Sequence, residues 1–230
     1  GELLHQGWGP DSGIPQISVS AIARDAEGLM WVGTENGLAR FDGQRFETFR
    51  QVDTPALQSS RITRLHHDRQ QRLWIGTTRG LAQRDAQGRF TAVMADDGEP
   101  GQVNGLAEEA SGTLYVATER GLFAARDGVL RRVDALHRRV TALTTHGESL
   151  WFTTQGALHR RQASGTQSFV LPAAWAEVAV NEMAWSGDTL WLSTSGGLLR
   201  WRQGAMSELA LETMPISLRG LAVDEAGNLW

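Results

Sequence analysis

Residues 29–43 read LMWVGTENGLARFDG, and near copies of this stretch recur along the 230-residue chain. Each copy has one aromatic residue at the same place, which we call its anchor: Trp31, Trp74, Tyr115, Trp151, Trp191 and Trp230. Successive anchors are 43, 41, 36, 40 and 39 residues apart. A period of this length is typical of solenoids and propellers. The stretch is therefore expected to be a structural module and not an active-site loop.

Each copy keeps the same residue types around its anchor. The third position after the first five anchors is threonine, at Thr34, Thr77, Thr118, Thr154 and Thr194. The second position is always small and the seventh is always leucine. Glycine occupies the sixth position in four copies, whereas the fourth copy carries it one residue earlier, at Gly156. Agreement of this kind over five copies identifies a repeat protein.

Turn residues divide each copy into four short β-rich segments, which in the first copy are VSAIAR, LMWVGT, GLARFD and RFETF. Asn36-Gly37 and Asp42-Gly43 are strong hairpin signals, because both turn positions must tolerate a positive φ. Four antiparallel strands in about 40 residues make one propeller blade, which buries its faces against neighbouring blades. We predict an all-β fold: a β-propeller of four-stranded antiparallel blades, with five complete repeats and part of a sixth.

The predicted domain is a single partial propeller over residues 1–230. Its blades are expected at about residues 18–50, 61–94, 102–134, 139–171 and 179–210, followed by a partial blade at 217–230. Residues 1–17 form a leading segment, in which Leu3–Trp8 is a candidate ring-closing strand. A seven-bladed ring would need roughly 280 residues at this period. We therefore expect a fragment of such a ring, whose exposed edge favours a homodimer or other edge-strand association.

Composition argues against several classes of protein. A formal net charge of −4 argues against nucleic-acid binding, because such surfaces are normally basic. No run approaches the roughly 18 apolar residues that a membrane span needs. The absence of cysteine excludes disulfides, thiolate metal sites and cysteine nucleophiles. The chain lacks an initiator methionine and ends within an expected strand, so we expect it to be part of a longer protein.

Residues 28–49, GLMWVGTENGLARFDGQRFETF, resemble the two-component regulator propeller repeat, whose pattern is D-x-x-G, LWxGT and xxGLxR. RLWIGTTRGLAQRD at 72–85 matches nearly as well, and TLWLSTSGGLLRW at 189–201 is recognisable. In that family such repeats form the periplasmic sensor region of bacterial hybrid histidine kinases or diguanylate cyclases, whose output domain follows a transmembrane span. The resemblance implies a periplasmic, non-catalytic sensor module, and the family's ligands are often oligosaccharides.

Ligand-binding residues are expected on the face that carries the turns between second and third strands and the connections between blades. Side chains in these turns vary between copies, whereas the strand residues that flank them do not. This is expected where the strands serve packing and the turns bind a ligand. The predicted rim consists of Asn36, Arg61, Arg79, Asn104, Arg120, Arg138, Arg139, Trp175 and Asn181. Its arginines suit bidentate capture of a carboxylate or sulfate, so an acidic sugar is one expected ligand. Trp175 is a candidate for stacking on a sugar ring.

Two other functions remain open. A lyase or hydrolase would need histidines and acids at recurrent inner-strand positions, which instead carry Ser20, Thr63, Asn104, Thr141, Asn181 and Arg219. G-x-S-x-G, H-E-x-x-H and nucleotide-binding motifs are also missing, so no catalytic residue, metal or cofactor is expected. A protein–protein interaction scaffold is the main alternative to a sensor. The sequence does not distinguish the ligand, the output domain or the oligomeric state.

Overall fold

The computed structural model describes residues 13–133, 137–209, 218, 220–224 and 226–230. The chain divides into two compact units, residues 1–103 and 104–230. The candidate ring-closing strand Leu3–Trp8 lies outside the described residues, as do residues 210–217 at the predicted boundary of the sixth repeat.

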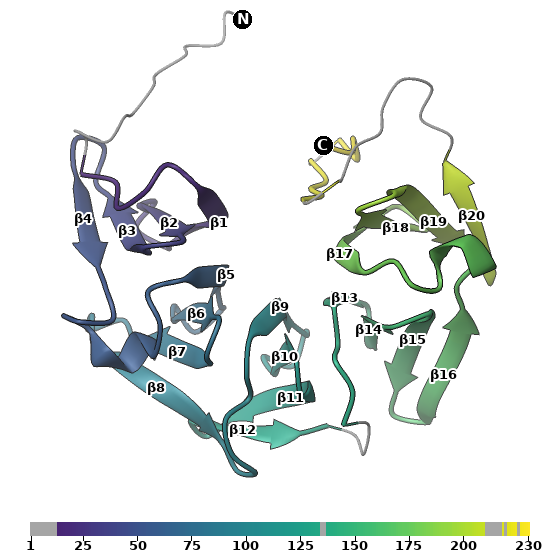
Figure 1. Cartoon of the computed structure of the whole chain (residues 1–230), viewed down its shortest axis with the longest axis horizontal. Helices are drawn as coiled ribbons and strands as arrows, with labels where there is room; N and C mark the ends of the chain where they lie inside the picture. The colour runs from purple at the N-terminus through teal and green to yellow at the C-terminus, as the bar shows by residue number, and fades with distance from the viewer. Residues whose placement is uncertain (1–12, 134–136, 210–217, 219, 225) are drawn as a thin grey trace, which may run out of the picture. The chain divides into compact units, whose positions relative to one another are not determined.

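The first unit contains two four-strand meanders (Figure 1). The first meander comprises β1 (Val19–Arg24), β2 (Met30–Thr34), β3 (Gly37–Phe41) and β4 (Phe46–Phe49). The second comprises β5 (Ile62–His67), β6 (Leu73–Thr77), β7 (Leu81–Arg84) and β8 (Phe90–Ala95). The short 3-10 helix η2 (Pro55–Leu57) connects them and buries Leu57.

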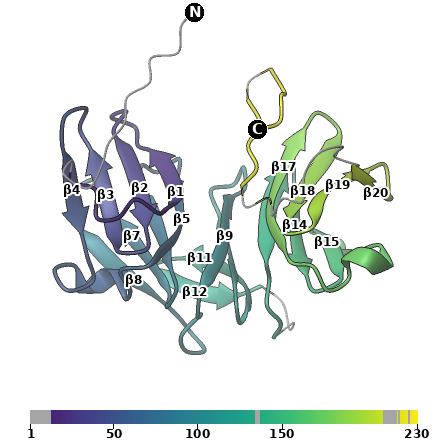
Figure 2. The same cartoon turned by 45° about the horizontal axis from the view of Figure 1, so that its top comes forward.

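The second unit contains three meanders of the same kind, seen from another side in Figure 2. They comprise β9 (Val103–Glu108), β10 (Leu114–Thr118), β11 (Gly121–Arg126) and β12 (Val129–Arg132); β13 (Ala142–His146), β14 (Ser149–Thr154), β15 (Ala157–Gln162) and β16 (Gly165–Val170); and β17 (Val180–Ser186), β18 (Thr189–Thr194), β19 (Gly197–Arg202) and β20 (Ala205–Leu209). The 3-10 helix η3 (Ala173–Trp175) lies between β16 and β17.

Consecutive strands pair antiparallel in every repeat, and the residues that flank the second hairpin turn face each other in four of the five complete repeats, as Thr34 and Gly37 do. In the second repeat the last paired residues are Gly76 and Leu81, and the Thr77 N–H donates to the Gly80 carbonyl at 2.9 Å. Each such turn spans two residues, so the alternation of side chains is kept in register from one repeat to the next. The prediction of an all-β fold built from four-stranded antiparallel meanders is confirmed.

Two anchor tryptophans, Trp31 and Trp151, pack between successive sheets within a unit, as predicted. Trp31 is fully buried with Ile62 and Ile75 of the next repeat, and Trp151 is buried with Val180 and other side chains of the fifth. Trp230 differs because its side chain is 77% exposed.

Small residues two positions after the anchor allow this close packing. A Cβ added at Gly33 would lie 2.6 Å from Ile62 Cγ2, and one added at Gly76 would lie 2.6 Å from Val103 Cγ1. Real Cβ atoms do not approach other carbons this closely, so a branched side chain of the next repeat occupies the space that glycine leaves open. The apolar residue of a first strand therefore packs directly on the small second-strand residue of the preceding repeat.

An aspartate accepts a hydrogen bond from the anchor tryptophan in the first, second and sixth repeats. Asp25, Asp68 and Asp224 each accept a hydrogen bond from the indole N–H six residues later, at 2.8, 2.7 and 3.0 Å. The same carboxylates accept backbone N–H groups of the turn between the first two strands. Hydrogen bonds from the side chains of Asn228 and Trp230 lower the pKa of Asp224 to about 2. In these three repeats the aspartate thus closes the turn and orients the tryptophan.

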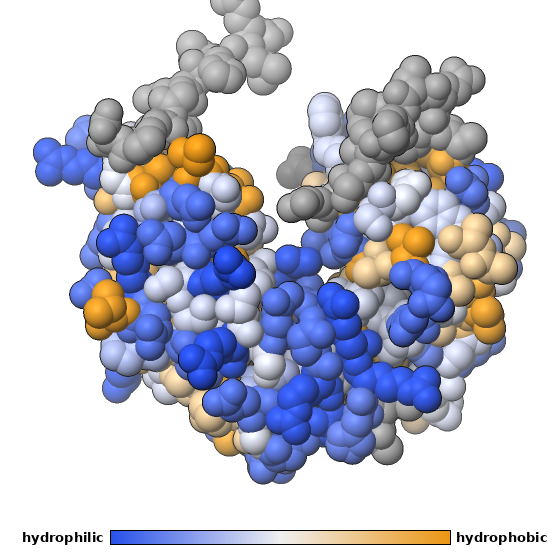
Figure 3. All heavy atoms as spheres, viewed as in Figure 1, coloured by the Kyte–Doolittle hydropathy of each residue, from blue (hydrophilic) through white to orange (hydrophobic). Residues whose placement is uncertain are grey.

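The face of the molecule drawn in Figure 3 is mostly hydrophilic, with scattered apolar patches. Among the described residues, none of the helices is long and apolar enough to span a membrane.

Candidate functional site in the fourth repeat

The turns between second and third strands are held by the recurrent threonine. Thr34 Oγ1 donates to the Gly37 carbonyl at 2.8 Å and accepts the Asn36 N–H at 3.1 Å. The same donation to a glycine carbonyl occurs at Thr77, Thr118 and Thr194. In these four repeats the threonine hydroxyl is therefore used inside the turn.

The fourth repeat is built differently because its glycine is displaced. Its turn is Gln155-Gly156, with Gly156 at a φ of +71°. The hydroxyl of Thr154 is instead 2.8 Å from Nε2 of His159 on β15, and His159 Nδ1 is 2.8 Å from Ser168 Oγ on β16. The His159 ring also stacks on Phe152, with 4.7 Å between ring centroids. The hydrogen bonds of Thr154, His159 and Ser168 thus connect three strands and replace the local bond between threonine and a glycine carbonyl.

Burial, and then the positive charge of Arg138, lower the pKa of His159 below its ordinary value. The neutral imidazole is therefore the favoured form at neutral pH.

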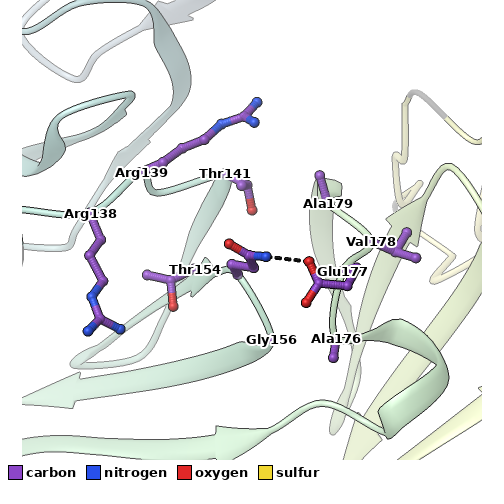
Figure 4. A pocket seen from close by; sticks show the side chains of 10 residues that line it. Arg138, Arg139, Thr141, Thr154, Gly156, Ala176, Glu177, Val178 and Ala179 are labelled. Atoms are coloured by element: carbon purple, nitrogen blue, oxygen red, sulfur yellow. Dashed lines mark hydrogen bonds between the residues drawn. The ribbon is translucent and has the colours of Figure 1, made fainter.

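A pocket of about 760 Å³ opens beside Thr154 and lies wholly within the second unit (Figure 4). We call it the fourth-repeat pocket. Three segments line it: Arg138, Arg139 and Thr141 before β13; Thr154, Gln155 and Gly156 at the end of β14 and in the β14–β15 turn; and Ala176, Glu177, Val178 and Ala179 before β17. Its volume is within the range of small-molecule sites.

Hydrogen bonds and an ion pair organise the pocket walls. The Gln155 amide donates to the Glu177 carboxylate, which joins the turn to the segment before β17 (Figure 4). Arg139 forms a salt bridge with Glu119 at 3.0 Å, while the Arg138 side chain points away from that of Arg139 in Figure 4. The lining therefore offers guanidinium, amide, carboxylate and hydroxyl groups. Such a set can hold a polar ligand with several hydroxyls or an anionic group.

Nothing in the described part of the chain groups three histidine, aspartate or glutamate side chains as metal ligands. The pocket's chemistry is that of hydrogen bonding and charge.

The predicted rim residues are distributed over both units. Arg138 and Arg139 come together in the fourth-repeat pocket. Arg120 is exposed at the tip of the β10–β11 turn, where its carbonyl accepts a hydrogen bond from Arg132 at 2.6 Å.

In the first unit, Asn36, Arg61 and Arg79 are exposed. Arg61 and Arg79 lie at neighbouring chain segments, because the Arg61 carbonyl accepts the Thr78 N–H at 3.2 Å.

Two predicted ligand-binding amides are used instead to join repeats. Asn104 is 6% exposed and donates to the Val140 carbonyl at 2.9 Å, and Asn181 donates to the Leu218 carbonyl at 2.6 Å. Ser20 makes the equivalent bond to the Ile62 carbonyl at 2.7 Å. A β-bulge at Asn181 and at Ser20 turns these side chains toward the next repeat. In these three repeats the side chain at the inner-strand position therefore links its strand to the backbone of the next repeat.

Trp175 also differs from the prediction of a sugar-stacking side chain. It is 5% exposed in a core cluster with Leu171 and Val180. Its ring lies 3.2 Å from the positions that Cβ atoms would take at Gly196 and Gly197. The indole fills space between the fourth and fifth sheets, so it is not available to a ligand from this face.

Sequence reasoning missed Thr154, His159 and Glu177 as site residues. The signal for His159 was present, because the eighth position after the anchor is apolar in every other complete repeat: Ala39, Ala82, Phe123 and Leu199. The displaced Gly156 marked the same repeat. No sequence signal identified Glu177, because its place in the pocket depends on the path of the chain after η3.

The profile of the two component regulator propeller family matches residues 13–36 and 56–79. These two segments therefore match the two-component regulator propeller repeat. No curated protein matches the sequence.

Solved structures similar to this chain include the extracellular domain of a hybrid two component system from B. thetaiotaomicron, at 19% identity and a TM-score of 0.66. The match covers 98% of this chain and 40% of that chain. A catalytically inactive virginiamycin B lyase from Staphylococcus aureus, in complex with quinupristin, has 16% identity and a TM-score of 0.73. That match covers 93% of this chain and 76% of the lyase. These likenesses establish the β-propeller fold of the repeats.

Proposed function

We propose that this regulator propeller is the extracytoplasmic sensor region of a bacterial signalling receptor, either a histidine kinase or a diguanylate cyclase, and that the fourth-repeat pocket binds its ligand. The family match and the similar extracellular domain of a hybrid two component system support the sensor role. The chain covers about two fifths of that domain, so the rest of the receptor belongs to the proposal.

The observation that carries the proposal is the departure of one repeat from the pattern of the others at a pocket. Four repeats use the recurrent threonine inside the turn, whereas the fourth releases Thr154 and places it on a cavity beside Arg138. Packing alone does not require this change, because the sibling turns are stable with the common arrangement. A polar lining with a guanidinium fits an oligosaccharide, including one with an acidic sugar.

A thermal-shift panel of neutral and acidic oligosaccharides tests this role. A bound ligand stabilises the native state in proportion to its concentration relative to Kd. Arg138→Gln should abolish the shift, whereas Arg79→Gln, an exposed arginine of the first unit, should leave it unchanged. A shift that survives Arg138→Gln would place the ligand elsewhere.

We propose a non-catalytic role for this region. His159 is 8% exposed and both ring nitrogens have hydroxyl partners, so the imidazole is not presented to the pocket as a general base. Turnover of any oligosaccharide that shifts the melting temperature, followed by product analysis, would contradict this and favour a lyase or hydrolase.

Self-association through the first sheet is also part of the proposal. Val19 and Ile22 of β1 are 47% and 63% exposed, whereas their equivalents Val180 and Met183 are 2% and 4% exposed under the preceding sheet. A second copy could cover this face. Light scattering should then give a dimer that Ile22→Glu dissociates, and a monomer at all concentrations would overturn it.

A further inference from the structure

His159 is a titratable group in an otherwise apolar column of the fold. Its counterparts in the other complete repeats, Ala39, Ala82, Phe123 and Leu199, are all fully buried. A leucine or phenylalanine at this position is therefore compatible with the blade. The fourth repeat has a histidine at a position where an apolar side chain is sufficient for packing in the other four complete repeats.

The two partners of the ring suit more than one protonation state. Thr154 Oγ1 and Ser168 Oγ each lie 2.8 Å from a ring nitrogen. A hydroxyl can donate or accept, so it can pair with a ring nitrogen that accepts or with a ring N–H that donates. The neutral ring needs one hydroxyl to donate, and the imidazolium needs both to accept. Protonation therefore leaves no ring nitrogen without a partner.

The charged groups around the ring come from few elements. The flanking strands β14 and β16 carry no charged residue. On β15, Arg160 points to the opposite sheet face, where its guanidinium lies over the Trp151 ring, and Arg161 follows two residues after His159. From outside the sheet, Arg138 acts on the imidazole, and Glu177 lines the same pocket.

Arg138 links the ring to the pocket. Its positive charge disfavours the imidazolium, as burial does, and its guanidinium lines the cavity together with Thr154 (Figure 4). An anion bound to Arg138 would offset that positive charge and so reduce the cost of protonating His159. The imidazolium would donate Nε2–H to Thr154 Oγ1, which directs the threonine O–H away from the ring. That hydroxyl could then donate to the anion.

We propose that the fourth-repeat pocket is a proton-coupled anion site, in which a carboxylate or sulfate group bound at Arg138 and Thr154 is accompanied by protonation of His159. This inference rests on the proposed ligand-binding role of the pocket and specifies the charge of the ligand and the pH response of the site. An acidic sugar would supply the carboxylate, and a sulfated sugar the sulfate.

Sulfate is the probe for the first test, because it does not titrate between pH 5.5 and 7.5. Calorimetry in two buffers of different ionisation heat should reveal proton uptake on binding. NMR of the His159 ring should show its pKa rising when sulfate is added. Sulfate should bind several-fold more tightly at pH 5.5 than at pH 7.5, since a displacement of one unit in pKa corresponds to at most a tenfold change in affinity.

Variants assign the effect to His159. His159→Leu copies the fifth repeat, should fold as the native chain does, and should bind sulfate without pH dependence; His159→Phe copies the third repeat and provides a second test. His137→Gln removes an exposed histidine next to Arg138 and should keep the native pH dependence. Comparing a galacturonate oligomer with a sulfated sugar then distinguishes the two sources of anionic group.

The outcomes separate this inference from the proposed function. Sulfate binding without proton uptake, or with a pH dependence that persists in His159→Leu, would overturn the coupling. Stabilisation by a neutral oligosaccharide in the absence of sulfate binding would overturn the anion site and leave the sensor role standing. No stabilisation by any oligosaccharide, combined with proton-coupled sulfate binding, would leave the anion site standing and contradict the oligosaccharide ligand.

Discussion

Replacing Asp68 by alanine should destabilise the first unit, because this side chain closes a turn and holds a buried tryptophan. Its carboxylate accepts four hydrogen bonds: from the N–H groups of Gln70 and Arg72 at 2.9 and 2.8 Å, from Arg72 Nε at 2.7 Å and from Trp74 Nε1 at 2.7 Å. Trp74 is only 2% exposed, so its indole N–H has no ready access to water. The variant therefore leaves a buried donor without an acceptor.

The magnitude follows from these contacts. A buried donor left unsatisfied costs about 1–3 kcal/mol, and loss of the turn hydrogen bonds adds about 1 kcal/mol. We expect Asp68→Ala to lower the free energy of unfolding by about 2–4 kcal/mol. The midpoint of urea unfolding gives the change in stability, and hydrogen exchange of the Trp74 indole N–H reports the local effect.

Asp85 provides a matched control. It accepts the N–H groups of Gln87 and Arg89 and the Arg89 side chain in the same kind of turn, but its described hydrogen bonds include no tryptophan. Asp85→Ala should therefore destabilise the protein distinctly less than Asp68→Ala. Equal losses for the two variants would refute the argument, because the turn alone would then account for the effect and the indole bond would contribute nothing.

Three further predictions follow from the packing and titration of the repeats. Gly76→Ala should cost about 1–3 kcal/mol by overpacking against Val103, and a double-mutant cycle with Val103→Ala should give a favourable coupling of about 0.5–3 kcal/mol; additive effects in urea unfolding would contradict the contact. Burial would raise the pKa of Asp68, but the hydrogen bonds from Trp74 and Arg72 outweigh it and leave the pKa below 3.8. Its contribution should thus be complete above pH 4 and fade at lower pH, so that the native chain and Asp68→Ala converge in acid unfolding; a difference that does not shrink on acidification would count against this. Trp175→Ala should cost about 3–5 kcal/mol because the indole fills the space over Gly196 and Gly197, and an unchanged melting temperature would show that this space is not filled by the indole.

The repeat pattern was sufficient to predict the strands and their turns. The spacing of Trp31, Thr34 and Gly37 predicts a hairpin, and these residues form one because the threonine bonds to a carbonyl only three residues away. The fate of Asn104 and Asn181 could not be predicted in the same way. Each pairs with a carbonyl 36 or 37 residues later, and at Asn181 a bulge decides which way the side chain points.

The sequence by itself determined the all-β repeat architecture, because a blade is specified by local alternation of side chains, short turns and a contact between small and branched residues that recurs at a fixed period. It also marked the fourth repeat as different through the displaced Gly156, whereas the role of His159 was not predicted. Only the tertiary structure decided that Trp175 belongs to the core and that Arg138, Thr154 and Glu177 share one pocket. Those positions depend on how successive sheets and their connections pack within a unit, and side chains far apart in the chain meet only when that packing is complete.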